Sequence, residues 1–143
     1  GLSLLFGLEQ VLALFAEEGL GNVYKRHSLM RDMTRSAMKA LGVPLLTTDE
    51  VASPTVTAIK PDDFDGESLR KQVKQDFNLD LAGGQQHLKG KIVRIGHMGY
   101  CTPADVLQTI SLIEVGLKKI GKDIELGKGV AAAQEVFINW NNN

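Results

Sequence analysis

The chain has 143 residues, of which 43% are hydrophobic and 23% are charged, and its formal net charge is −1. This length is typical of a single domain that buries a core, and the near-neutral charge gives no electrostatic sign of a nucleic-acid or membrane partner. The single cysteine, Cys101, excludes an internal disulfide and a cysteine-rich zinc site, and it favours a cytoplasmic location. The apolar opening, residues 1–6, soon meets Glu9 and Glu17, so it resembles neither a signal peptide nor a membrane span.

The first third of the chain is predicted to form a long, kinked helix. Gly19 and Gly21 predict the bend, because a glycine inside a helix costs about 1 kcal/mol relative to alanine. The apolar stripes at helical spacing are Leu5, Leu8, Leu12 and Phe15 before the bend and Val23, His27, Met30, Thr34, Ala37 and Leu41 after it. The first stripe needs another domain or a second copy to pack on. A chain that begins with Gly1 inside such a stripe is expected to be part of something longer.

Short strands separated by turns and a helix are predicted for the middle of the chain. Gly42 is expected to end the first helical segment, and Asp65 is a candidate cap for a helix whose apolar face is Leu69, Val73 and Phe77. The predicted strands are residues 43–46, 55–59, 79–82 and 92–95. Gly83 and Gly84 are interpreted as a flexible loop rather than a phosphate-binding turn, because no strand-to-helix dinucleotide unit surrounds them.

One arginine interrupts the last predicted strand. Residues 92–95 are β-branched and apolar except for Arg94, and Gly96 and Gly99 follow. A half-buried arginine must reach water or hold a partner, while glycines at a strand end let the backbone turn or a small ligand approach. The local pattern favours an edge-strand arginine paired with a surface carboxylate. The alternative is an anion-binding arginine at the mouth of a site.

Two helices are predicted for the last third. Thr102 as cap, Pro103 at the first position and Asp105 reaching back mark the start of the first one. Its buried stripe is expected to be Val106, Ile110, Ile113 and Leu117, and Lys118, Lys119 and Lys122 are expected to form a solvated helix end. A final amphipathic helix is expected over residues 130–140, with a frayed Asn tail. These elements predict an α+β fold, a small and largely antiparallel sheet with helices packed on one face.

Catalytic and metal-binding motifs are sparse. The chain has no Walker loop, GxSxG elbow or HExxH pair, and no histidine has a carboxylate at ligand spacing, so no metal site is predicted. His27 is expected to pack within its helix and His87 to be exposed. His97 is expected to anchor a turn by a hydrogen bond, with a site shared with Arg94 as the alternative. Cys101 has no neighbouring base in the sequence and is expected to pack.

Several segments resemble one known family. Gly83-Gly84-Gln85-Gln86-His87 and, further on, Arg94-Ile95-Gly96-His97-Met98-Gly99 closely resemble the C-terminal segment of class V pyridoxal-phosphate (PLP) aminotransferases. This family includes alanine–glyoxylate and serine–pyruvate aminotransferases and cyanobacterial proteins named soluble hydrogenase 42-kDa or small subunit. Residues 17–27, 53–58 and 127–135 are also similar to it, so the resemblance covers nearly the whole chain, in family order.

The resemblance implies that residues 1–143 are a single C-terminal (small) domain of a homodimeric fold type I enzyme whose large PLP-binding domain is absent from this chain. The family's Schiff-base lysine, pyridinium aspartate and phosphate site belong to that large domain. The resemblance therefore implies no catalytic, cofactor-binding or metal residue here, and no PLP in the fragment alone. Arg94 matches the arginine that binds the substrate α-carboxylate.

The activity implied for the whole enzyme is transfer of an amino group from a small amino acid, alanine or serine, to glyoxylate or pyruvate. The fragment alone is expected to be inactive. The hydrogenase name has no support in the residues, because one cysteine cannot supply iron–sulfur or nickel ligation. Other branches of the family carry apolar residues at the position of His97, which argues against a catalytic role for it. The alternative function is a non-catalytic α+β module that binds an amino acid or a partner subunit.

Overall fold

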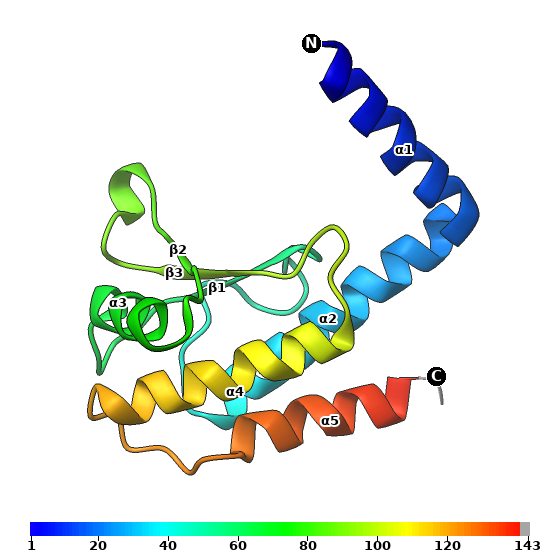
Figure 1. The fold of residues 1–143 in the computed structure, drawn as a ribbon. Coiled ribbons are helices and arrows are strands. Elements are labelled where there is room, and N and C mark those ends of the chain that lie inside the picture. The colour runs from blue at the N-terminus through cyan, green and yellow to red at the C-terminus, as the bar shows by residue number, and fades with distance from the viewer. Residues whose placement is uncertain (141–143) are drawn as a thin grey trace.

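The computed structural model describes residues 1–140, and the Asn tail predicted to fray lies outside them. The fold is α+β, as predicted, with helices packed on one face of a small antiparallel sheet (Figure 1). The elements are α1 (Leu2–Glu18), α2 (Leu20–Ala40), β1 (Val56–Ile59), α3 (Gly66–Phe77), β2 (Ala82–Gly83), a 3-10 turn η1 (Gln86–Leu88), β3 (Val93–Gly96), α4 (Pro103–Lys119) and α5 (Lys128–Trp140). No helix among the described residues is long and apolar enough to cross a membrane.

The sheet has the strand order β1-β3-β2, so β3 is the central strand and is antiparallel to both neighbours. Thr57 and Ile59 of β1 and Val93 and Ile95 of β3 are buried. These residues face α2 and α4, which run along one side of the sheet with α5 beyond them (Figure 1). Within residues 1–140 no helix packs on the opposite side of the sheet, which is called the open face below.

The core depends on α2, whose predicted stripe from Val23 to Leu41 is buried throughout. Met30, Met33 and Met38 are fully buried, because an unbranched thioether fills irregular gaps between helices. Gly42, at φ +64°, ends the helix. There the Val43 N–H donates to the Met38 carbonyl (2.9 Å), the hydrogen bond of a Schellman motif.

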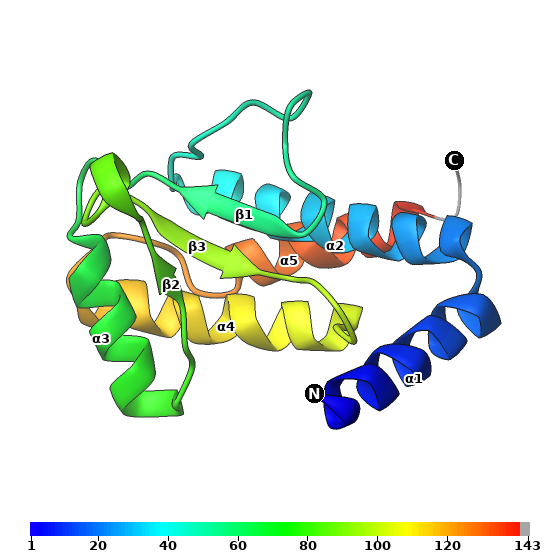
Figure 2. The same ribbon diagram turned by 90° about the horizontal axis from the view of Figure 1, so that it is seen from above.

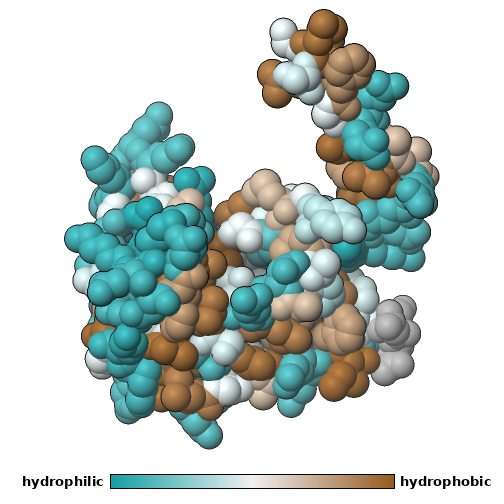
Figure 3. Space-filling model, in the orientation of Figure 1, coloured by the Kyte–Doolittle hydropathy of each residue, from teal (hydrophilic) through white to brown (hydrophobic). Residues whose placement is uncertain are grey.

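The predicted kink is a full break between two helices. Gly19 adopts φ +81°, and its carbonyl accepts from Asn22 and Val23, so α1 ends and α2 begins at this one residue. In Figure 2, α1 projects away from the rest of the molecule. It has no buried residue, and its apolar side chains stand clear in Figure 3. Leu5, Leu8 and Leu12 of the first predicted stripe therefore have no partner within the described residues, while Phe15 is partly buried.

The remaining helices begin where the sequence predicts. Asp65 accepts from the backbone N–H groups of Glu67 and Ser68 at the start of α3, and Thr102 and Asp105 form a capping box at the start of α4. The N-terminus of α5 is held by Glu114 of α4. That buried carboxylate accepts from the N–H groups of Gly127 (2.6 Å), Gly129 (2.8 Å) and Val130 (3.1 Å).

Three local predictions are wrong. Residues 43–46 form only an isolated bridge between Leu45 and Ile59, made by the Lys60 N–H bond to the Pro44 carbonyl and the Leu46 N–H bond to the Ala58 carbonyl. Pro44 has no N–H with which to extend the pairing. The strand predicted over residues 79–82 is instead the two-residue β2, Ala82–Gly83. Lys122 is not part of a solvated helix end, because its ammonium pairs with Asp63 and lies 5.4 Å from the centre of the Phe64 ring.

Candidate functional site

Arg94 lies at the centre of the open face of the sheet. It sits in the central strand, and its neighbours Val93 and Ile95 point into the core. Side chains alternate along a strand, so Arg94 points to the opposite, uncovered side and is only partly buried. The expectation of an edge-strand arginine is wrong, and no ion pair to Arg94 occurs among residues 1–140.

The guanidinium of Arg94 is oriented by a single hydrogen bond. Its Nε–H donates to the Gly83 carbonyl of β2 at 2.9 Å. Neither Nη atom donates to another residue in the described part of the chain. A guanidinium whose Nε is occupied still presents two parallel N–H groups at its end, which match the two oxygens of a carboxylate.

Small residues surround Arg94 on this face. Its cross-strand neighbours are Ala58 in β1 and Ala82 in β2. The next residue of β3 on the same face is Gly96, and a Cβ added there would have no atom within 4 Å. The residues around Arg94 on this face therefore have short side chains or none, which leaves room for a small ligand beside its guanidinium.

Gly83 forms part of β2 and Gly84 is required by close packing, which corrects the interpretation of this pair as a flexible loop. Gly83 belongs to β2 and supplies the carbonyl that orients Arg94. A Cβ on Gly84 would lie 1.9 Å from the Leu88 carbonyl oxygen. Arg70 of α3 supports β2 from below, because its Nε–H donates to the Leu81 carbonyl at 2.7 Å.

His97 anchors the end of β3 from inside the core. It is 1% exposed, and its Nε2 lies 2.9 Å from the Thr57 Oγ1 of β1. The backbone N–H of His97 also donates to the Thr55 carbonyl at 3.0 Å. Burial lowers the pKa of His97 to about 4. The hydrogen-bond prediction for His97 is confirmed, and its ring points away from the Arg94 face.

Two residues of α2 hold the turn that follows. The His27 ring bonds the Val23 carbonyl through Nδ1 (2.7 Å) and accepts the Gly99 N–H at Nε2 (3.2 Å). One Nη of Arg26 donates to the carbonyls of Gly99 (2.9 Å) and Cys101 (3.0 Å). The prediction of a packed His27 is confirmed. Its contact with Gly99 could not be predicted from the sequence, because the two residues are far apart along the chain.

Arg26 has a second role at the junction of α1 and α2. Its Nε and other Nη donate to the two carboxylate oxygens of Glu18, at 2.7 and 2.9 Å. This bond holds the pKa of Glu18 below its usual value. Sequence reasoning assigned no role to Arg26, and the only local signal was its place next to His27 after the glycine break.

The remaining candidate residues take no part in this site. His87 is exposed on η1, as predicted. Cys101 packs partly against the core, also as predicted, and burial raises the pKa of its thiol, which disfavours a reactive thiolate. No group of three or more metal-ligating side chains occurs within residues 1–140.

The most buried of the described lysines does not fit a Schiff-base role. Lys122 is the most buried of them, and it is engaged with Asp63 and the Phe64 ring. A lysine that condenses with an aldehyde must present a free amine. That PLP is held outside this chain remains a prediction.

This arrangement is that of an aminotransferase C-terminal domain. The structure superposes on ureidoglycine–glyoxylate aminotransferase from Bacillus subtilis with a TM-score of 0.83 and 36% sequence identity, over 89% of this chain and 33% of that one. No protein-family model matches the chain.

Sequence comparison points to the same class. The chain is 41% identical to the soluble hydrogenase 42 kDa subunit of Anabaena cylindrica over 138 residues, 96% of this chain and 36% of that protein. It is 38% identical to serine–glyoxylate aminotransferase of Arabidopsis thaliana over 134 residues, 92% of this chain and 33% of that protein. The chain thus spans about a third of the length of these relatives. In sequence and fold it is a homologue of class V aminotransferases over about this third of their length.

Proposed function

We propose that residues 1–143 are the substrate-binding C-terminal domain of a PLP-dependent transaminase. The reaction is transfer of an amino group from a small amino acid, alanine or serine, to glyoxylate or pyruvate. The name of the Arabidopsis relative, a serine–glyoxylate aminotransferase, supports this substrate class. In this proposal PLP is bound by a large domain outside the chain and serves as the electron sink of the reaction.

Arg94 binds the substrate α-carboxylate. The observation that carries this role is the guanidinium on the open face, with Nε held by the Gly83 carbonyl and both Nη atoms available. A charged, bidentate contact fixes the orientation of the substrate as well as its affinity. Ala58, Ala82 and Gly96 leave the space that the rest of the substrate needs.

The large domain covers the open face, and the enzyme is a homodimer. Support comes from two surfaces that lack a partner among the described residues, the Arg94 face and the apolar side chains of α1. Figure 1 shows α1 rising on the open side of the sheet, and the space-filling view in Figure 3 shows a hollow between α1 and the rest of the molecule. A folded body seated there would bury the apolar surface of α1 and bring reacting groups to Arg94. The single cysteine supports a cytoplasmic location.

The test is Arg94→Ala in the full-length protein loaded with PLP. We expect KM for amino acid donors to rise by at least about 30-fold, which corresponds to about 2–4 kcal/mol for a lost charged contact. Arg94→Lys keeps the positive charge but loses the two parallel N–H groups of the guanidinium, so it should recover only part of the affinity for the amino acid donor. Unchanged KM values in Arg94→Ala would contradict the proposed role. A full-length protein without a PLP-dependent transaminase activity would favour the non-catalytic binding module instead.

A further inference from the structure

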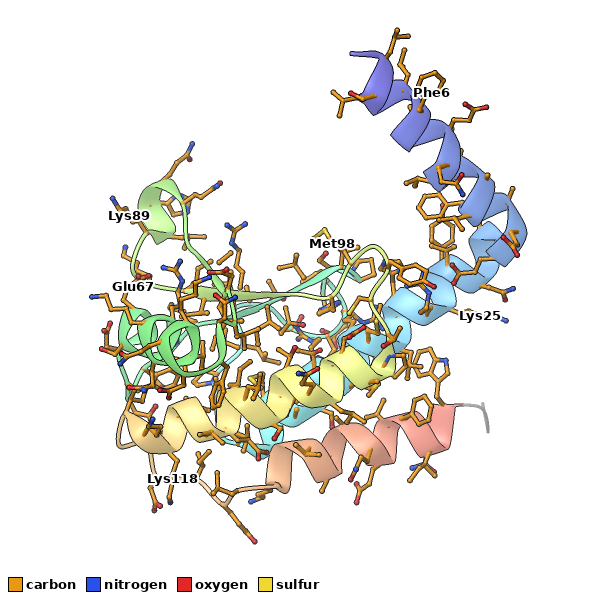
Figure 4. All side chains as sticks on the ribbon, in the orientation of Figure 1. Phe6, Lys25, Glu67, Lys89, Met98 and Lys118 are labelled. Atoms are coloured by element: carbon orange, nitrogen blue, oxygen red, sulfur yellow. The ribbon has the colours of Figure 1, made fainter. Side chains whose placement is uncertain are left out.

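Met98 lies on the same face as Arg94, two residues beyond Gly96. Along β3 and just past it, exposure alternates: Val93, Ile95 and His97 are buried, while Arg94, Gly96 and Met98 are not. The strand pairing extends to His97, whose N–H bonds the Thr55 carbonyl, so the alternation reaches Met98. In Figure 4 the Met98 side chain projects from the side of the sheet opposite α2 and α4.

Gly96 separates the two side chains and leaves the gap between them open. A Cβ at Gly96 would have nothing within 4 Å. Residues four apart on an extended chain are about 13 Å apart at their Cα atoms. Arg94 and Met98 therefore border a gap wide enough for a small amino acid, with a cation at one end and an apolar side chain at the other.

The backbone that carries Met98 is fixed. The next residue, Gly99, adopts φ +76°, a conformation that favours glycine. Its N–H is bonded to His27 and its carbonyl to Arg26, both from α2. The Met98 side chain itself is 55% exposed. The fixed backbone therefore places a flexible thioether side chain at the edge of the site.

We propose that Met98 is a specificity-determining residue that contacts the side chain of the bound amino acid. This inference rests on the proposed function, because it takes the carboxylate of that amino acid to be held by Arg94. Met98 limits the length of the side chain that fits over Gly96, and it disfavours charged side chains, since it offers no polar group to replace their water. The ligand class is therefore short, uncharged 2-amino acids.

The test compares kcat/KM of the full-length, PLP-loaded protein for L-alanine and L-2-aminobutyrate, with glyoxylate as acceptor. Met98→Ala should raise the ratio of kcat/KM for 2-aminobutyrate to kcat/KM for alanine by about 10-fold, because the space left by the shortened side chain accommodates the extra methylene of 2-aminobutyrate. Met98→Lys should raise the ratio of L-aspartate to alanine by a similar factor. Leu126→Ala is the matched control, since Leu126 is 57% exposed and lies in the loop before α5; both ratios should stay unchanged.

Arg94→Ala, measured in parallel, distinguishes a failure of the proposed role of Met98 from a failure of the proposed function. If it raises KM for every donor while neither Met98 variant changes a ratio, the role of Met98 is overturned and the proposed function stands. If Arg94→Ala leaves KM unchanged, the proposed function itself fails. Thermal melting of each variant shows whether it is folded. Ratios of kcat/KM on one enzyme do not depend on the amount that is folded, so a destabilised variant still gives a valid result.

Discussion

Protonation of His97 should make the fold less stable at mildly acidic pH. The imidazole is buried, its Nε2 is bonded to Thr57, and its Nδ1 has no partner within the described residues. The ring is therefore held in its neutral form, and burial lowers its pKa to about 4 in the folded protein. In the unfolded chain the same ring has a pKa of about 6.5.

The sign and size of the effect follow from these two values. Between pH 6.5 and 4 the unfolded chain binds a proton at His97 that the folded chain does not, so the free energy of unfolding falls as pH falls through this range. With a folded pKa of about 4, the loss attributable to His97 is about 2 kcal/mol at pH 5 relative to pH 8. That is a large share of the 5–15 kcal/mol typical of a domain.

Urea unfolding followed by far-UV circular dichroism at pH 8 and pH 5 measures this loss. His97→Gln retains an amide that can bond Thr57 but cannot titrate, so its stability should fall by about 2 kcal/mol less than that of the unmodified chain over the same interval. His87→Gln removes an exposed histidine and should leave the pH dependence unchanged. An equal pH dependence in His97→Gln and the unmodified chain would refute the assignment to His97.

Two further substitutions test contacts that support the site. Glu114→Gln should lower the free energy of unfolding by about 2 kcal/mol, because three backbone N–H groups lose a charged acceptor; urea unfolding checks this against the exposed control Glu135→Gln, and equal midpoints would contradict it. Gly84→Ala would place a Cβ 1.9 Å from the Leu88 carbonyl and should cost at least about 2 kcal/mol, whereas Gly21→Ala, with open space around it, should be neutral or stabilising by thermal melting.

The parts of the fold that local chemistry decides were predictable from the sequence. The stripe from Val23 to Leu41 lies on one helical face whatever the rest of the chain does, and its burial follows from its composition. The capping box of Thr102 and Asp105 uses residues three apart, so its geometry is fixed once the helix begins. Strand lengths were predicted less well, since β2 has only two residues and its extent depends on pairing with β3.

The contacts that fix the site connect distant parts of the chain, and their partners could not be predicted. Arg26 and His27 lie more than seventy positions before Gly99, and no periodicity links them. Lys122 looks like part of a solvated lysine cluster in the sequence, yet its side chain is buried and pairs with the exposed Asp63 from a different loop. In each case the partner of a polar side chain is supplied by tertiary packing.

Arg94 shows why a local pattern cannot distinguish a structural arginine from a binding one. A guanidinium pairs with a carboxylate in the same geometry whether the carboxylate belongs to the protein or to a ligand, so the residues from 92 to 95 allow both interpretations. The surroundings of the Arg94 guanidinium decide between the two interpretations. The Gly83 carbonyl takes Nε, the neighbours on the face are alanine and glycine, and no acidic side chain of the described chain reaches the two Nη atoms. The neighbouring positions on this face are filled by residues too small to reach the guanidinium, and no other described element brings a carboxylate to it.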